Sequence, residues 1–361
     1  MGKTMTSENK FGLWNFVRDP LAGQRKRKRK NIDAHKFLDV PVDVKPDLDL
    51  AMVKRVVFYN HYHNGDIHFA RGIVAEIIRE FPKISYTYSH GCPVDLLQDM
   101  ETVRHAPALL ARLPKHEKYL IDHAQKTVYI NTWIGCLGAG ILGEYRGINI
   151  TLLHRLISAS IKRAMGMDPP RLQKCVPDPN FSKFSIDGIN DFIRRDSRQK
   201  VMISNGKILS GQSAEFDFSP LIQSVARYYP DVLFIPTNPT DVHVSNVIHS
   251  ADIIKKNGPD LNENGYLSTF CDVIIGRSSG TYSYAINRTN LRSRKVFLGF
   301  VNLPVEASLG FDEPVFEPRC EFIATNDFRE HFMLRRIVET VGKWTQLGSA
   351  SNPHFHKTEN T

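Results

Sequence analysis

Asp66 stands in a loop that combines an acid, histidines and a glycine. The loop runs from His61 to His68 and follows a run of β-branched and aromatic residues, Val56–Tyr59. In an open α/β sheet such a loop joins the carboxyl end of a strand to a helix, which is where ligands bind. Gly65 permits a tight turn there. Asp66 is therefore a candidate general base for a hydroxyl nucleophile, with a helix-capping carboxylate as the alternative.

The same loop carries three histidines. His63 is the second candidate for the base, and the candidates for contact with the molecule that carries the hydroxyl are His61, Asn64, Gly65 and His68. Histidines at i, i+2 and i+7 also allow a metal site, but this spacing does not by itself supply ligands with a defined geometry. We therefore predict no metal ligand and no cofactor.

Two loops in the second half of the chain are rich in hydrogen-bond donors. The first spans residues 204–213 and its candidates are Asn205, Gly206, Lys207, Ser210 and Gly211. Glycines, hydroxyls and a lysine can surround phosphate oxygens. The residue order is not the Walker order GxxxxGK[ST], and a plain flexible loop is the alternative.

The second donor-rich loop spans residues 276–281 and follows the predicted strand Asp272–Ile275. Its candidates for anion binding are Arg277, Ser278, Ser279, Gly280 and Thr281. Backbone N–H groups at a helix start favour an anion, and an arginine could add a bidentate contact to a diphosphate. A serine-capped helix is the alternative. Two such loops at equivalent strand ends favour phosphate binding.

Residues between these loops are candidates for the rest of a nucleotide. Thr237 and Asn238 end a predicted strand and could border a nucleoside pocket, and Glu263 could contact a ribose. Polar residues at helix starts also serve as caps, which is the alternative for Glu263.

The elements that must position these loops alternate along the chain. In the first half the periodicity predicts strands at 53–59, 84–88 and 127–133, and helices at 67–81, 94–113 (one or two short ones) and 152–165. In the second half it predicts strands at 200–204, 231–236, 247–254, 272–275 and 296–300, and helices at 220–228, 261–270, 280–287 and 327–344. This alternation predicts an α/β fold with doubly wound parallel sheets, as two Rossmann-like domains that face a cleft.

A length of 361 residues suits two domains. The proline-rich stretch at 168–179 is the best candidate for the connection between them. The expected organisation is a flexible basic arm (1–50), an N-terminal Rossmann-like domain (51–168), a linker (169–199), a C-terminal Rossmann-like domain (200–326), a terminal helix (327–347) and a disordered tail (348–361).

The formal net charge of +9 is concentrated in one run, Arg25–Lys30, which contributes +6 and leaves +3 for the rest. Such a run could bind nucleic acid or an anionic membrane surface, act as a localisation address, or stay solvated. Five cysteines without a CxxC pair, no apolar N-terminal segment and no apolar stretch long enough to cross a membrane predict a cytoplasmic protein, peripheral attachment to a membrane being an option.

These motifs resemble glycosyltransferases of the GT-B architecture, most closely the heptosyltransferase-type families. Asn64-Gly65-Asp66 resembles the Gly-Asp pair that opens the first helix in those families, and residues 272–280 resemble the late segment that holds the nucleotide diphosphate. That segment departs from the family pattern, which has an acid before Ser-Gly and a histidine after it, whereas this chain has Arg277 and Tyr282-Ser283. With its Arg277, the segment is similar to that of fucosyltransferase-like GT-B enzymes, which use arginine at the diphosphate.

The resemblance implies an enzyme that moves a hexosyl, heptosyl or deoxyhexosyl group from a nucleotide-sugar donor to a hydroxyl of a saccharide or other acceptor, as in polysaccharide biosynthesis. It implies a metal-independent, inverting reaction with Asp66 as the base. Two alternatives stay open. One is a non-catalytic protein that binds nucleotides or sugar phosphates, and the other is a glycosyltransferase acting on nucleic acid through Arg25–Lys30. No oligomeric state is predicted.

Overall fold

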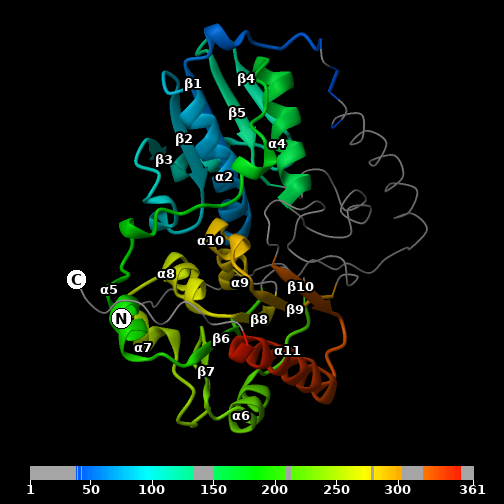
Figure 1. Ribbon diagram of the computed structural model, residues 1–361. Coiled ribbons are helices and arrows are strands. Elements are labelled where there is room, and N and C mark those ends of the chain that lie inside the picture. The colour runs from blue at the N-terminus through cyan, green and yellow to red at the C-terminus, as the bar shows by residue number, and fades with distance from the viewer. Residues whose placement is uncertain are drawn as a thin grey trace, which may run out of the picture.

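The computed structural model describes residues 38, 40–41, 43–133, 150–208, 213–277, 280–302 and 320–350. These residues form two lobes, one above the other in Figure 1, and each lobe contains a five-stranded sheet. The prediction of two α/β halves is confirmed.

The sheet of the first lobe has the strand order β3-β2-β1-β5-β4. Its strands are β1 (Arg55–Asn60), β2 (Ser85–His90), β3 (Val103–His105), β4 (Tyr119–Asp122) and β5 (Thr127–Asn131). All neighbours are parallel except β4 and β5. After its first residue β1 is buried throughout, as expected of a central parallel strand covered on both faces.

The prediction of parallel strands throughout is wrong at β4, which pairs antiparallel with β5. Four residues separate the two strands, and Lys126 adopts a positive φ of 52° at the end of this turn. A hairpin needs only such a short connection, whereas a parallel crossover needs a dozen residues or more. The three-residue strand β3 was likewise not predicted, because it lies within a stretch assigned to short helices.

The first lobe is covered by α2 (Asn64–Glu80) and α4 (Ile150–Met165), which pack on the sheet and on each other. The helical spacing predicted for α2 is confirmed, since its buried apolar residues include Ile67, Ile73 and Ile77. Short 3-10 turns complete the lobe: η1 (Leu50–Met52), η2 (Val94–Leu97) and η3 (Pro107–Arg112).

The sheet of the second lobe is parallel throughout, in the order β10-β9-β8-β6-β7. Its strands are β6 (Gln199–Ser204), β7 (Val232–Pro236), β8 (Val273–Arg277), β9 (Val296–Phe300) and β10 (Glu321–Thr325). Its helices are α5 (Asp187–Arg195), α6 (Ser219–Tyr228), α7 (Ser250–Ile254), α8 (Leu261–Leu267), α9 (Gly280–Ala285), α10 (Arg288–Arg292) and α11 (Glu330–Ala350), with 3-10 turns η5 (Leu172–Lys174), η6 (Phe181–Lys183) and η7 (Ser268–Phe270).

One face of the second sheet packs on α6 and α11, and the other face packs on the layer of α7, α8 and α9 that turns toward the first lobe (Figure 1). The strand predicted at 247–254 is wrong. Its end forms α7, and only Val247 makes an isolated bridge, to Phe234. A short apolar run fits a buried strand or a buried helix equally well.

The strand orders place a topological switch point in each sheet, between β1 and β5 in the first and between β6 and β8 in the second. Helices on either side of such a point leave a crevice at the carboxyl ends of the strands, where ligands bind in doubly wound folds. The loop that carries Asp66 follows β1, and the two donor-rich loops follow β6 and β8. The predicted loops therefore lie at the two switch points.

Gly72 lets the chain segment before α5 cross α2 at close range. A Cβ at Gly72 would lie 1.9 Å from the carbonyl oxygen of Cys175. We therefore expect Gly72→Ala to lower the free energy of unfolding by about 1–3 kcal/mol or more, although alanine is the better helix former. Gly91→Ala is the matched control, because its Cβ would have no neighbour closer than 3.8 Å. Urea unfolding of both variants measures the difference, and equal stability would contradict this close approach.

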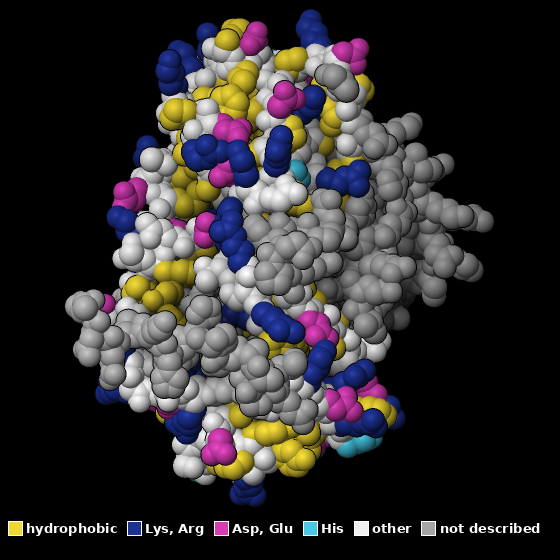
Figure 2. Space-filling view, in the orientation of Figure 1, with side chains coloured by type: hydrophobic (Ala, Val, Ile, Leu, Met, Phe, Trp, Pro, Cys, Tyr) yellow, Lys and Arg dark blue, Asp and Glu magenta, His cyan; other side chains and the backbone are white. Residues whose placement is uncertain are grey.

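Within the described part of the chain, no helix is long and apolar enough to span a membrane. On the face drawn in Figure 2, Lys and Arg side chains are spread over both lobes among acidic ones instead of forming a single patch.

Candidate functional site

Asp66 lies in the first turn of α2, directly after the loop that follows β1. The residue keeps part of its surface exposed, while burial of the carboxyl group raises its pKa to about 6. Hydrogen bonds from the backbone of His63 and of Asp66 itself oppose this shift. The carboxylate is thus ionised at neutral pH yet basic enough to take up a proton, which is what general base catalysis requires.

The surroundings of Asp66 are polar groups at the carboxyl ends of β2 and β5. The hydroxyl of Tyr88 lies 2.6 Å from Thr132 Oγ1. Burial, with a smaller effect of the Asp66 carboxylate, raises the pKa of Tyr88 and raises that of Cys92 to about 11. Both groups therefore stay protonated near the carboxylate. They were not singled out from the sequence, where only their positions at strand ends could have indicated them.

The histidines of the Asp66 loop have different environments. His63 is the exposed N-cap residue of α2 and makes no side-chain capping bond. His61 Nε2 donates to the carbonyl oxygen of Leu113 (2.8 Å), and burial lowers its pKa. His61 thereby anchors a neighbouring loop, whereas the His63 ring remains open to a ligand.

His68 is fully buried between the lobes. Its Nε2 donates to the carbonyl oxygen of Ile286 (3.0 Å), and its ring stacks on Tyr284 at 4.2 Å. Burial lowers the pKa of His68 to about 3, so the ring is neutral. The structure places this histidine in the contact between the lobes.

Arg277, Asn205 and Asn238 come together at the switch point of the second sheet. Arg277 Nη2 donates to the carbonyl oxygen of Asn205 (2.9 Å). Asn205 Nδ2 donates to Asn238 O (3.1 Å), and the Asn238 N–H donates back to Asn205 Oδ1 (2.8 Å). Thr237 Oγ1 lies 3.4 Å from Asn238 Oδ1. Four residues that were predicted to bind the nucleotide-sugar donor, from the ends of three strands, are thus neighbours.

The Arg277 guanidinium is a buried cation that forms no salt bridge with the described residues, although the carboxylates of Glu215 and Asp217 act on it electrostatically. Its residue is 4% exposed, and its Nε and Nη1 have no hydrogen-bond partner there. Its Cζ lies 5.0 and 5.2 Å from the ring centres of Phe216 and Phe218. Burial lowers the pKa of Arg277, and the nearby carboxylates of Glu215 and Asp217 oppose this shift. A buried charge that lacks a salt bridge and leaves two of its nitrogens unpaired among the described residues is costly, so this environment favours an anionic ligand.

For the other residues that were predicted to bind the nucleotide-sugar donor, the structure gives at most the degree of burial. Lys207 is exposed, Gly206 is partly buried and Thr281 is buried. Ser210, Gly211, Ser278 and Ser279 lie outside the described residues, as does the basic run Arg25–Lys30.

Glu263 lies in the contact between the lobes. Its Oε1 is 2.8 Å from Lys256 Nζ, which also lies 3.3 Å from Asp95 of the first lobe. The Ser185 N–H donates to the same oxygen (3.4 Å). Lys256 thus connects Glu263 with Asp95 of the first lobe.

Arg71 of α2 makes a buried hydrogen bond between the lobes. Its Nη1 donates to Asn262 Oδ1 of α8 (3.1 Å), and the guanidinium also contacts the Leu96 carbonyl oxygen and Asp99. Both Arg71 and Asp99 are buried. Because Arg71 follows Asp66 by little more than one helical turn, this contact restrains the carboxylate relative to the second lobe.

The two loops singled out from the sequence are in contact across the lobes. A Cβ at Gly280 would lie 3.9 Å from Asn64 Cβ, and one at Gly65 would lie 2.9 Å from Ser283 Oγ. Arg277 precedes Gly280 by three residues, which span at most about 11 Å. The backbone of Arg277 therefore lies within about 11 Å of the residue that contacts the first lobe.

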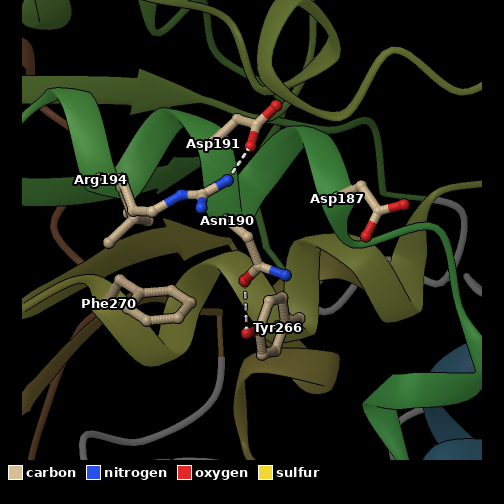
Figure 3. A pocket seen from close by; sticks show the side chains of 7 residues that line it. Asp187, Asn190, Asp191, Arg194, Tyr266 and Phe270 are labelled. Atoms are coloured by element: carbon tan, nitrogen blue, oxygen red, sulfur yellow. Dashed lines mark hydrogen bonds and ion pairs between the residues drawn. The ribbon is translucent and has the colours of Figure 1, made fainter.

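A separate cavity of about 560 Å³ lies between α5 and α8 with η7, lined by Asp187, Asn190, Asp191, Ile193, Arg194, Tyr266 and Phe270 (Figure 3). In it the Tyr266 hydroxyl donates to Asn190 Oδ1 (2.8 Å), and Arg194 pairs with Asp191. None of its lining residues was predicted to bind a ligand, and it is distinct from the Asp66 and Arg277 loops. Among the described residues no three His, Cys, Asp or Glu side chains are grouped closely enough to hold a metal ion.

No protein-family model matches the chain, and no curated protein matches it. Its fold is similar to that of solved glycosyltransferases. ADP-heptose heptosyltransferase II from E. coli has a TM-score of 0.45 at 11% identity, over 81% of this chain and 99% of its own. A glycosyl transferase family 9 protein from Veillonella parvula has a TM-score of 0.46 at 10% identity (83% and 99%).

The E. coli heptosyltransferase WaaC, solved with ADP, has a TM-score of 0.45 at 11% identity, over 80% of this chain and 98% of its own. Because the identities and TM-scores are low, we infer function from the residues of this chain.

The close approach of Gly65 to Ser283 provides a test of the contact between the loops. We expect Gly65→Ala to lower kcat/KM by about 3- to 10-fold, because its Cβ would lie 2.9 Å from Ser283 Oγ, so Ser283 must rotate or α2 must shift and displace Asp66. The double variant Gly65→Ala/Ser283→Ala should recover most of the activity, because it removes the Oγ atom that the new methyl group meets. Steady-state kinetics of the two single variants and the double variant measure this coupling, and purely additive losses would contradict it.

Proposed function

We propose that this chain is a glycosyltransferase that moves a sugar from a nucleotide-sugar donor to an acceptor hydroxyl. The observation that carries the proposal is the buried guanidinium of Arg277, whose Nε and Nη1 lack partners among the described residues at the switch point of the second sheet. Its complement is the Asp66 carboxyl, with its pKa raised to about 6, on the loop that meets α9. A diphosphate on one side and a hydroxyl on the other are the two ligands these groups suit.

In the proposed reaction, Arg277 binds the diphosphate of the donor, with Asn205, Asn238 and Lys207 beside it. The acceptor oxygen attacks the anomeric carbon as the bond from that carbon to the diphosphate oxygen breaks. The nucleoside diphosphate leaves with the bonding electrons, and Arg277 stabilises the negative charge that develops on it. Arg277 and Lys207 thus supply the positive charge that the leaving group requires.

Asp66 takes the proton of the acceptor hydroxyl, with His63 as the second candidate. A base that activates the acceptor for direct attack leads to inversion at the anomeric carbon, because attack and departure occur on opposite faces. The donor class is a hexosyl, heptosyl or deoxyhexosyl nucleotide.

The test begins with thermal shifts of the full chain in the presence of nucleoside diphosphates. A diphosphate present at 100 times its Kd should stabilise the fold by about 2.7 kcal/mol. The base that gives the largest shift then selects the nucleotide-sugars for a transfer assay, and NMR of the product reports the anomeric configuration. A screen without any shift would count against the proposal, and retention of configuration would contradict the role of Asp66.

A further inference from the structure

Tyr62 and Trp133 form a stacked aromatic pair beside Asp66. Their ring centres are 3.6 Å apart, the rings are 15° from parallel, and both residues keep part of their surface exposed. Tyr62 precedes Asp66 by four residues, and Trp133 follows β5, the strand that pairs with β1. The pair therefore lies at the same switch point as the candidate base.

Backbone bonds hold both residues in place. The Tyr62 N–H donates to Asn60 Oδ1 (2.8 Å), and the Trp133 N–H donates to Asn131 Oδ1 (3.0 Å). Cys92 Sγ donates to the Tyr62 carbonyl oxygen (3.5 Å). The Tyr62 hydroxyl and Trp133 Nε1 make no hydrogen bond within the part of the chain that the structure describes. The backbone of the pair is fixed while its polar tips are available to a ligand.

The loop at residues 113–118 borders the pair. The Tyr59 hydroxyl donates to the Glu117 carbonyl oxygen (3.0 Å), and Asn131 Nδ2 donates to those of Lys115 (3.1 Å) and Glu117 (2.9 Å). The ring of His116, which is exposed, lies 6.1 Å from that of Trp133. Side chains at the ends of β1 and β5 thus hold a polar rim next to the aromatic rings.

We propose that Tyr62 and Trp133 form the platform that binds the acceptor, and that this acceptor is a saccharide whose pyranose ring packs its C–H face on the aromatic pair. The inference rests on the proposed function of Asp66. A pyranose presents an apolar C–H face to the negative face of an aromatic ring and hydroxyls at its edge to polar tips. A polyol phosphate or an aliphatic alcohol has no such face. A partly exposed aromatic pair with a few polar groups beside it suits the sugar ring.

The experiment is saturation-transfer NMR of the full chain with a panel of methyl pyranosides, with glycerol 1-phosphate as the acyclic probe. We expect ring C–H protons of at least one pyranoside to receive saturation, and glycerol 1-phosphate to receive none. Trp133→Ala and Tyr62→Ala should weaken pyranoside binding about tenfold or more, and Trp133→Phe should retain it within about threefold. Tyr228→Ala is the matched control, because Tyr228 is 67% exposed in the second lobe.

Three results would overturn the platform: no pyranoside binds the wild-type protein, glycerol 1-phosphate binds as well as the pyranosides, or Trp133→Ala binds them unchanged. Retention by Trp133→Phe separates loss of stacking from misfolding. Failure of the proposed function has a different signature, because nucleoside diphosphate binding depends on Arg277 in the other lobe. Pyranoside binding that requires Trp133, without any nucleotide shift, supports the platform and counts against the transferase.

Discussion

Asp66→Asn is expected to lower turnover by about 10²- to 10⁴-fold while leaving the thermal shift with nucleoside diphosphates unchanged. The amide cannot take up the proton of the acceptor hydroxyl, but it has nearly the same size and can still accept the backbone hydrogen bonds. Asp252→Asn is the matched control, since that side chain is 72% exposed. Steady-state kinetics and thermal shifts on both variants separate catalysis from binding. A non-catalytic binding protein would show no such difference.

The pH dependence follows from the raised pKa of Asp66. The base must be ionised, so kcat/KM of the wild-type protein should rise with pH, with its midpoint at about pH 6, and level off about one pH unit higher. This rise of kcat/KM with pH, the acid limb of the profile, should be absent from the residual activity of Asp66→Asn. An acid limb that persists unchanged in the variant would assign the base to another group, with His63 as the first candidate.

Stability should change in the opposite direction to activity. Burial raises the pKa of Asp66 from 3.8 to about 6, so the folded state binds this proton more tightly than the unfolded state does. The fold is therefore destabilised as pH rises from about 4 through 6, and Asp66→Asn should be more stable at pH 7.5 by about 1–3 kcal/mol. The gain should vanish near pH 4, where the carboxyl is protonated in the folded state. A loss of stability at pH 7.5 would indicate a capping role for Asp66.

Arg277→Met is expected to weaken nucleoside diphosphate binding by at least about 100-fold without loss of stability in the free protein. Methionine keeps much of the apolar stem and its contacts with Phe216 and Phe218, but it removes a buried charge that forms no salt bridge with the described residues. Replacing such a charge by an apolar side chain is often neutral or stabilising. Thermal shifts with and without the nucleotide measure both effects in one experiment.

Two further variants define the role of Arg277. Arg277→Lys should retain only part of the binding, because an ammonium cannot contact a diphosphate through a planar fork. Arg329→Met is the matched control, since Arg329 is an exposed arginine of the same lobe that pairs with Asp327. If Arg277→Met unfolds readily and its nucleotide shift persists, the guanidinium is structural and the anion binds elsewhere.

Much of the fold could be predicted from local sequence. Parallel strands buried on both faces appear as short apolar runs, such as Val56–Tyr59 and Val296–Phe300, and the helix after Asp66 repeats its apolar residues at helical spacing. The errors occurred where local pattern is ambiguous. Short apolar stretches became α7 instead of a strand, and β4 turned back antiparallel.

The candidate site was predictable in outline, because glycine-marked loops after strands are where doubly wound sheets bind ligands. This reasoning led to Asp66 and Arg277 as residue types at suitable positions. It did not separate His63, which is exposed, from His68, which is buried against Tyr284. The two histidines are close together in the sequence, His63 just before α2 and His68 within it. Which face of α2 meets the second lobe depends on packing between segments about 200 residues apart.

The amino-acid sequence was sufficient for the two α/β halves and for the loops that carry the candidate groups, because these depend on contacts between near neighbours in the chain. The chemistry of those groups depends on distant contacts. Burial against other segments raises the pKa of Asp66 and leaves two guanidinium nitrogens of Arg277 without a hydrogen-bond partner among the described residues. Pairing of β1 with β5 brings Tyr62 to Trp133, 71 positions apart, and packing of α2 on α9 brings the two loops into contact. Desolvation and proximity are properties of the folded chain, so they become visible only when the lobes are assembled.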